Sequence, residues 1–225
     1  MSAPAYVPAL GFDWLTPFYD AVAWVIGERS MKRELLQAAH LRAGQDLLDL
    51  GCGTGTLVVM AKQGWPELRV VGMDLDPRIL GIARGKIDRA GVDVGLQLGS
   101  ATAPPFAPAS FDRVVTTLML HHLTTDEKRA TLGAVRRLLR SGGELHIADW
   151  GPPQNQLMRF ATELVEWFDG HARLAANVRG ELPAMLTAAG FARVEQGTRR
   201  MTPFGTLAFL HATALTEGDE RTNIV

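Results

Sequence analysis

Cysteine and net charge are both scarce in this chain. Cys52 is the only cysteine among 225 residues, which excludes an intrachain disulfide and any metal site built from several cysteines. The net charge is −1, so the composition gives no general attraction to nucleic acid or to an anionic membrane. No basic stretch precedes an apolar run near the N-terminus, and no apolar segment reaches transmembrane length. We therefore expect a cytoplasmic protein without stable membrane insertion and without a nucleic-acid partner.

The residues that are present are those of an ordinary globular protein. Hydrophobic residues make up 47% of the chain and charged residues 21%. A chain of 225 residues can bury one substantial core, whereas two domains would be cramped. Because the sequence also has no internal repeat and no long linker, we expect a single domain.

The run DLLDLGCGTGTL, residues Asp46–Leu57, is the most informative segment of the chain. An apolar strand pattern leads into Gly51, Gly53 and Gly55, and a helix pattern follows over about Thr56–Gln63. Glycine is needed where the backbone turns tightly from strand to helix and a ligand approaches main-chain atoms. The helix points N–H groups and a partial positive charge back at the loop. The run therefore predicts a small-molecule site at the carboxyl end of a first parallel strand.

Helix and strand patterns alternate over the range Met31–Trp150, which predicts a largely parallel α/β sheet. The strands that we expect are Asp46–Leu50, Arg69–Asp74, Gly95–Leu98, Arg113–Thr117 and Glu144–Asp149.

Several helix ends carry local signals. Asp76 is placed as the N-cap of one helix, which Gly91 can end. Thr124 and Glu127 have the spacing of a capping box at the start of another helix. The Ser141–Gly143 stretch predicts a turn from this second helix into the next strand.

The two ends of the chain are less regular. The N-terminal stretch Phe12–Ile26 is unusually aromatic, and an aromatic helix is expected around Phe160–Phe168. Beyond it we expect a short helix near Leu182–Ala189, strands near Phe191–Gln196 and Thr206–Thr213, and a frayed polar tail over Glu217–Val225.

Four segments resemble, in order and at compatible distances, the motifs of class I S-adenosylmethionine-dependent methyltransferases. They are DLGCGTG, VVGMDLDP (70–77), GSATAPPFAPASFDRVV (99–115) and LRSGGELHIADW (139–150), and the chain resembles the ubiquinone/menaquinone-type branch of this family. The resemblance implies a Rossmann-like three-layer sandwich with a mostly parallel seven-stranded sheet and an antiparallel C-terminal hairpin. It also divides the domain into an N-terminal helical lid region (1–44), a cofactor-binding core (45–151), acceptor-side helices with the last two strands (152–216) and the tail (217–225).

The resemblance implies S-adenosylmethionine as cofactor and S-adenosylhomocysteine as product. Asp74 closes the second strand, where a carboxylate can accept hydrogen bonds from both ribose hydroxyls. Asp49 could balance the cofactor's ammonium or could instead bind the loop's own N–H groups. Ser100 stands where the family often has Asp, and the N–H of Ala101 is available to the adenine ring. The expected cofactor-binding residues are Tyr19 of the lid, Asp49, Gly51, Cys52, Gly53, Gly55, Asp74, Leu75, Ser100, Ala101 and Thr117.

His121 and His122 follow the fourth strand, where the family builds its acceptor site. Methyl transfer mainly requires a positioned acceptor and exclusion of water, and a neutral His can serve as base when the acceptor carries a proton. If the chain is extended there, the two side chains point to opposite faces, and His122 is preferred because it lies nearer the loop. A structural hydrogen bond is the alternative role for either histidine.

The fifth strand ends at Asp149 and Trp150, so both could border the acceptor cavity, and Asp149 could equally anchor a loop. A metal site built from His121, His122, His146 and Asp149 is a poor interpretation because the spacing of metal ligands is absent. We therefore expect no metal.

The leading hypothesis is an enzyme that methylates a small-molecule acceptor. Within the same class, the alternative is C-methylation of a quinone-like ring. From another class, the alternative is a regulatory module that binds S-adenosylmethionine without transferring its methyl group. A nicotinamide-dependent reductase is disfavoured, because G-x-G-x-G is one residue shorter than the G-x-G-x-x-G of dinucleotide sites. The irregular ends of the chain could also carry the contacts of a homodimer.

Overall fold

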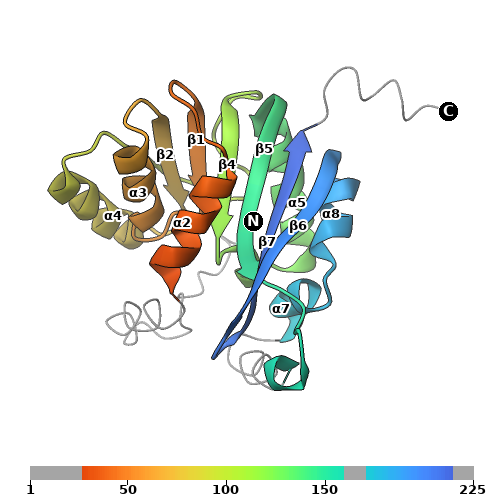
Figure 1. Cartoon of the computed structure of the whole chain (residues 1–225). Coiled ribbons are helices and arrows are strands. Elements are labelled where there is room, and N and C mark those ends of the chain that lie inside the picture. Colours follow the sequence, from red (N-terminus) through yellow and green to blue (C-terminus); the bar gives the residue numbers. More distant parts are fainter. Residues whose placement is uncertain (1–26, 160–170, 215–225) are drawn as a thin grey trace.

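Seven strands form one sheet in the order β3-β2-β1-β4-β5-β7-β6 (Figure 1). This computed structural model describes residues 27–159 and 171–214. β1 to β5 pair in parallel, whereas β7 runs antiparallel to both β5 and β6. The expected α/β sheet with an antiparallel C-terminal hairpin is therefore confirmed. The strands are β1 (Asp46–Leu50), β2 (Arg69–Asp74), β3 (Gly95–Leu98), β4 (Phe111–Thr117), β5 (Leu139–Trp150), β6 (Phe191–Thr202) and β7 (Gly205–Ala214).

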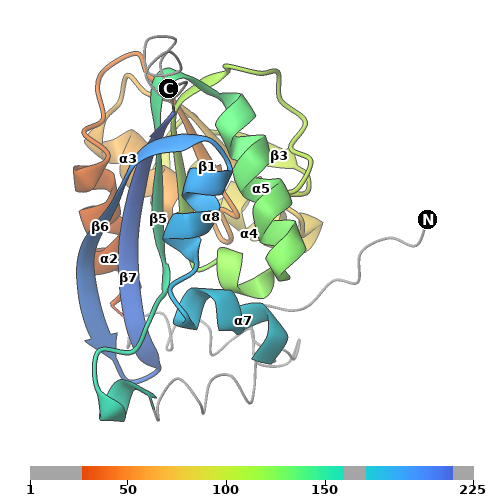
Figure 2. The ribbon, with the colours of Figure 1, turned by 90° about the vertical axis from the view of Figure 1, so that its right-hand side faces the viewer.

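Helices cover both faces of the sheet and complete the three layers (Figures 1 and 2). On one face lie α2 (Glu28–Ala38), α3 (Thr56–Gly64) and α4 (Pro77–Ala90). On the other face lie α5 (Thr125–Leu138) and α8 (Leu182–Ala188). The short 3-10 helix η2 (Leu120–His122) joins β4 to α5, and α7 (His171–Val178) lies near the end of β5.

Each face of the sheet has its own apolar core. Leu47 and Val115 belong to the cluster under α2 and α3, and their neighbours Leu48 and Val114 belong to the cluster under α5 and α8. Successive side chains of a strand point to opposite faces, so adjacent residues supply both cores. All four of these side chains are fully buried, which explains why neighbouring residues in the middle of β1 and of β4 are both apolar.

The predicted helix caps are confirmed. Thr124 and Glu127 form the full capping box, in which the Thr124 N–H donates to Glu127 Oε2 at 2.8 Å. The Asp76 carboxylate accepts from the N–H of Arg78 at 2.8 Å, and Gly91 ends α4 with a φ of 63°. These local bonds fix the ends of α4, which follows β2, and the start of α5, which follows β4 and η2.

The predicted turn at Ser141–Gly143 was wrong. β5 already begins at Leu139, and this stretch is an irregularity in its pairing with β4. Gly142 has a φ of 72°, and a Cβ at Gly143 would lie 2.9 Å from the Arg140 carbonyl oxygen. A bulge uses the same glycine signals as a turn but does not end the strand, which explains the error.

β6 extends to Thr202, beyond the expected end at Gln196. It is the edge strand of the sheet, and its later residues are mostly exposed and polar. Its register with β7 also shifts between Gln196 and Arg199, so the simple alternation that marks a strand is absent from the sequence. The alternation of apolar residues in the sequence therefore predicts a strand that is too short.

Several expected segments lie outside the described residues. These are the aromatic N-terminal stretch with Tyr19, the aromatic helix around Phe160–Phe168 and the polar tail over Glu217–Val225. Of the helices within 27–159 and 171–214, none combines the length and apolarity needed to cross a bilayer.

The capping box provides a direct test of the α5 boundary. Thr124→Ala should lower the free energy of unfolding by about 1 kcal/mol, because the N–H of Glu127 loses its side-chain acceptor. Urea unfolding measures this change. Thr125→Ala, one residue further into the helix, is the matched control and should change stability by less than about 0.5 kcal/mol. Equal effects of the two substitutions would contradict the assigned cap.

Candidate functional site

The loop between β1 and α3 turns through three glycines with positive φ. These angles are 76° at Gly51, 53° at Gly53 and 78° at Gly55. The N–H groups of Gly51 and Cys52 both donate to the Met73 carbonyl, at 2.8 and 2.9 Å, which ties the loop to β2. No atom outside the chain neighbours lies within 4 Å of a Cβ built at Gly53. The loop thus leaves room at its centre for a ligand to reach main-chain atoms.

The other two loop glycines are required by close packing as well as by φ. A Cβ at Gly51 would lie 2.5 Å from Met119 Cγ, and a Cβ at Gly55 would lie 2.9 Å from the Cβ of Ala83. Met119 belongs to the segment that follows β4, so the glycine loop contacts that segment. Met119 could not be recognised from the sequence, because its role depends on this tertiary contact.

Asp74 joins the end of β2 to the glycine loop. Its Oδ2 accepts from the N–H of Gly53 at 2.9 Å, and its Oδ1 accepts from the N–H of Asp76 at 3.1 Å. Each carboxylate oxygen can accept more than one hydrogen bond. The half-buried Asp74 side chain therefore keeps acceptor capacity beside the loop.

Asp49 is a buried carboxylate without a hydrogen-bond partner among the described residues. It is 1% exposed, and neither of its oxygens is paired. Burial raises the pKa of Asp49 to about 7, against the opposing charge of Lys32 and with a further increase from Asp74. Lys32 itself is buried and pairs with Glu28 on α2. The structure thus places an unsatisfied acidic group near the end of β1, and the N–H groups of Gly51, Cys52, Gly53 and Gly55 are bonded elsewhere.

Two exposed leucines lie at the ends of the neighbouring strands β2 and β3. Leu75 follows β2 and is 48% exposed, and Leu98 ends β3 and is 50% exposed. The Ser100 hydroxyl lies 2.9 Å from the Thr102 hydroxyl, and its oxygen also accepts from the Thr102 N–H at 3.3 Å. Large exposed apolar side chains at strand ends provide a surface for a flat ring. Leu98 was missed from the sequence because the strand pattern itself accounts for a leucine there.

Cys52, Thr117 and Ala101 complete the predicted set within the described residues. Cys52 is 3% exposed, and burial raises the pKa of its thiol, so it is not a nucleophile at neutral pH. Thr117 is buried at the end of β4, next to the β5 residue Ala148. Ala101 lies half-buried directly after Ser100.

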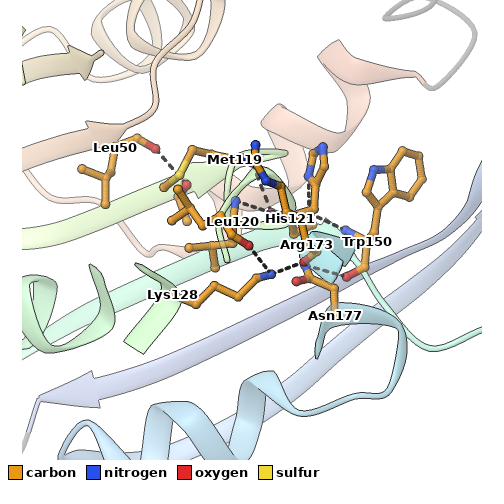
Figure 3. A network of polar contacts seen from close by, with 11 residues as sticks. Leu50, Met119, Leu120, His121, Lys128, Trp150, Arg173 and Asn177 are labelled. Atoms are coloured by element: carbon orange, nitrogen blue, oxygen red, sulfur yellow. Dashed lines mark hydrogen bonds and ion pairs between the residues drawn. The ribbon is translucent and has the colours of Figure 1, made fainter. Parts of the chain in front are cut away.

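Asp149 organises the segment after β4. Its Oδ2 accepts from the main-chain N–H groups of Met119, Leu120 and His121, at 3.2, 2.8 and 3.4 Å. Its Oδ1 accepts from the Trp150 N–H at 2.7 Å and lies 2.8 Å from His121 Nδ1 (Figure 3). Burial opposes ionisation, but His121 and the Trp150 N–H outweigh it and hold the pKa of Asp149 below its usual value. The expected loop-anchoring role is present.

His121 and His122 are side by side rather than on opposite faces. The chain is not extended here, because η2 begins at Leu120, and the two imidazole centroids are 4.0 Å apart. His121 is 5% exposed, and its ring lies 6.3 Å from that of Trp150. Burial is the main cause that lowers the pKa of His122 to about 3, and the nearby cations Arg173 and Lys128 add to the shift. The two histidines therefore differ in chemistry although they are adjacent in sequence.

His146 belongs to a different cluster. It lies 2.9 Å from Glu144 and stacks on His211 of β7 with a centroid separation of 5.5 Å. Within the described parts of the chain, no three His, Cys, Asp or Glu side chains gather in a way that could hold a metal ion.

Comparisons with known proteins agree with this geometry. The family described as "Methyltransferase domain" matches residues 47–143. The chain is 32% identical to a demethylmenaquinone methyltransferase of Thermus thermophilus, over 63% of this chain and 65% of that protein. It is 34% identical to the nocamycin O-methyltransferase of Saccharothrix syringae, over 79% of this chain and 60% of that protein. It is 33% identical to an uncharacterized methyltransferase of Synechocystis, over 65% of this chain and 67% of that protein.

A solved structure shows the same fold. It is that of phosphoethanolamine N-methyltransferase 2 of Haemonchus contortus in complex with S-adenosyl-L-methionine. The TM-score is 0.71 at 19% identity, and the match covers 96% of this chain and 61% of that protein. The match to the Thermus and Saccharothrix relatives likewise spans less than two thirds of their length.

Gly51→Ala tests the packing of the loop. The substitution should destabilise the protein by about 1–3 kcal/mol, because it combines a strained φ with a clash against Met119. Chemical unfolding measures the difference. Gly64→Ala at the end of α3 is the matched control, since its Cβ meets nothing within 4 Å, and it should be neutral or stabilising. A Gly51→Ala protein as stable as Gly64→Ala would contradict the assigned contact.

Proposed function

Because the chain belongs to the class I S-adenosylmethionine-dependent methyltransferases, we propose that it transfers a methyl group to a small-molecule acceptor. The observation that supports the donor site most strongly is the buried, unpaired carboxylate of Asp49 beside the glycine loop. A buried acidic group without a partner is unfavourable unless a cationic group joins it. The ammonium of the cofactor's amino-acid end is such a group.

The remaining donor-side residues fit the other parts of the cofactor. The Asp74 oxygens keep lone pairs for the ribose hydroxyls, in addition to their bonds to the Gly53 and Asp76 N–H groups. The exposed Leu75 and Leu98 side chains offer an apolar surface for the adenine ring. Ala101 follows three residues after Leu98, and its N–H could donate to a ring nitrogen. S-adenosylmethionine, when bound, supplies a methyl group that its sulfonium already activates.

On the acceptor side we assign the base to His121. With Asp149 ionised, His121 Nδ1 donates to it and Nε2 remains as a proton acceptor. His122 was preferred from the sequence, but a histidine with a pKa of about 3 is a weak base at neutral pH. Trp150, beside His121, provides an apolar wall that helps to exclude water from the reacting groups.

A quinone-like ring that accepts the methyl group on carbon is the second candidate. It is supported by the Thermus relative, a demethylmenaquinone methyltransferase, whereas the Saccharothrix relative is named as an O-methyltransferase. The cytoplasmic location and the homodimer stay predictions from the sequence.

Binding and transfer test the proposal separately. Calorimetry with S-adenosylhomocysteine should give saturable binding, and the absence of binding at millimolar ligand would refute the donor site. Transfer of a labelled methyl group should then be measured with reduced short-tail quinones and with phenolic and amine acceptors. Binding without transfer to any acceptor class would favour the regulatory module.

Cofactor binding should release protons near neutral pH. Asp49 is partly protonated there, because its pKa is about 7, and a bound ammonium favours the carboxylate. The affinity for S-adenosylhomocysteine should therefore rise as the pH increases from about 6 to about 8. Calorimetry in phosphate and in Tris measures the released proton through the difference in buffer ionisation heat.

The matched control ligand is 5′-methylthioadenosine, which lacks the amino-acid end and should release no proton. Equal observed heats in both buffers with S-adenosylhomocysteine would contradict the role of Asp49.

The two histidines should differ in their effect on transfer. His121→Gln should slow methyl transfer to a proton-bearing acceptor by about 100-fold or more, because it removes the base. His122→Gln should slow the transfer by less than about tenfold. Both variants should retain the wild-type affinity for S-adenosylhomocysteine, which calorimetry checks. A larger effect at His122 would reverse the assignment.

A further inference from the structure

Lys128 is a fully buried lysine near the start of α5, with no solvent-exposed surface. Lysine is almost never buried in this way unless its ammonium is paired, because removing the charge from water is costly. Among the described residues, its hydrogen bonds go to two main-chain carbonyls and not to a carboxylate. One is the carbonyl of Leu123, at 2.8 Å, and the other is that of Arg173. The ammonium therefore has a specific geometric role.

The two carbonyls belong to segments that are distant in sequence. Leu123 directly follows η2, which carries His121 and His122, and Arg173 lies in α7. Figure 3 shows the Lys128 side chain reaching from α5 to the Arg173 carbonyl, below His121. A hydrogen bond to a charged donor is stronger than one between neutral groups. Lys128 thus joins α5, α7 and the segment after β4 at a single atom.

A second bond attaches the other end of α7. The Asn177 side chain, 1% exposed, donates from Nδ2 to the Trp150 carbonyl at 3.3 Å. α7 also packs directly against η2 and β5. Lys128 and Asn177 therefore hold the two ends of α7 against the elements that carry His121 and Trp150.

The charge of Lys128 is balanced through space by buried and half-buried carboxylates. Burial lowers the pKa of Lys128, whereas Asp149 of β5, Glu127 of α5 and Glu181 before α8 oppose this shift, and Arg173 adds to it. Asp149 also holds His121 and the main chain of η2. Removal of the Lys128 cation would thus leave Asp149 without one of its balancing charges.

We propose that Lys128 is a positioning residue, which fixes α7 to the segment carrying His121 and His122 and so holds the wall of the acceptor side in place. The proposal rests on the proposed function only in naming this side as the acceptor side. The contacts themselves are independent of the reaction.

Lys128→Met tests the proposal, since methionine keeps an unbranched side chain of similar length and loses the ammonium. Lys62→Met is the matched control, because Lys62 also donates to a carbonyl, that of Leu68 at 2.6 Å, on the opposite face of the sheet. Amide hydrogen exchange should become about tenfold faster or more over residues 171–178 in Lys128→Met, with little change over the glycine loop. Lys62→Met should leave residues 171–178 unchanged.

A spectroscopic readout separates positioning from general stability. The proton between His121 Nδ1 and Asp149 should give a slowly exchanging downfield signal in wild type and in Lys62→Met. In Lys128→Met this signal should broaden or disappear, while the affinity for S-adenosylhomocysteine stays within about twofold of wild type. A sharp signal with unchanged exchange of α7, or uniformly faster exchange of all elements, would overturn the proposal. Wild-type protein that fails to bind S-adenosylhomocysteine would instead refute the proposed function.

If Lys128→Met does not fold, a measurement on the wild-type protein tests the proposal instead. The Lys128 ammonium protons should then be visible by nitrogen-edited NMR at neutral pH, because two carbonyls hold them away from water. A Lys128 ammonium that exchanges as fast as a free lysine would overturn the proposal.

Discussion

The segment after β4, which we propose as the acceptor side, depends on one buried carboxylate, that of Asp149. Its two oxygens accept from four main-chain N–H groups, of Met119, Leu120, His121 and Trp150, and bind the His121 ring. The chain leaves β4 through Leu118, a bulky residue at a φ of 49°, which is unfavourable without strong local constraints. The Asp149 bonds supply those constraints. Thus a single charge at the end of β5 determines the path of the segment that carries both histidines.

The proposed donor and acceptor sides are joined by direct contact. The glycine loop can approach the segment after β4 only because Gly51 has no side chain, and Met119 fills the space. Asp49 is buried near the same loop without a partner, and Asp74 connects the loop to β2. Burial of charged groups is tolerated here because each carboxylate has donors or, for Asp49, a ligand ammonium that we propose to complete the site.

Local sequence signals predicted most of the fold, including the glycine loop between β1 and α3. The first three strands, the Asp76 cap and the Thr124 capping box depend on neighbouring residues, and the structure confirms them. The predicted start of β5 at Glu144 was wrong, because a bulge and a turn share the same glycine signals. The relative placement of His121 and His122 could not be predicted, because η2 is set by Asp149, a residue distant in sequence. The role of Lys128 could not be predicted either, because a lysine on a helix normally faces solvent, whereas this one is buried.

Substitution of Asp149 by its neutral isostere tests this account most directly. In Asp149→Asn, the amides of Met119, Leu120 and His121 should exchange at least about tenfold faster, because the carboxylate that accepts from them is lost. The amides of β1 and the affinity for S-adenosylhomocysteine should remain near their wild-type values. Unchanged protection of Met119, Leu120 and His121 in this variant would contradict the claim that Asp149 holds the acceptor side together.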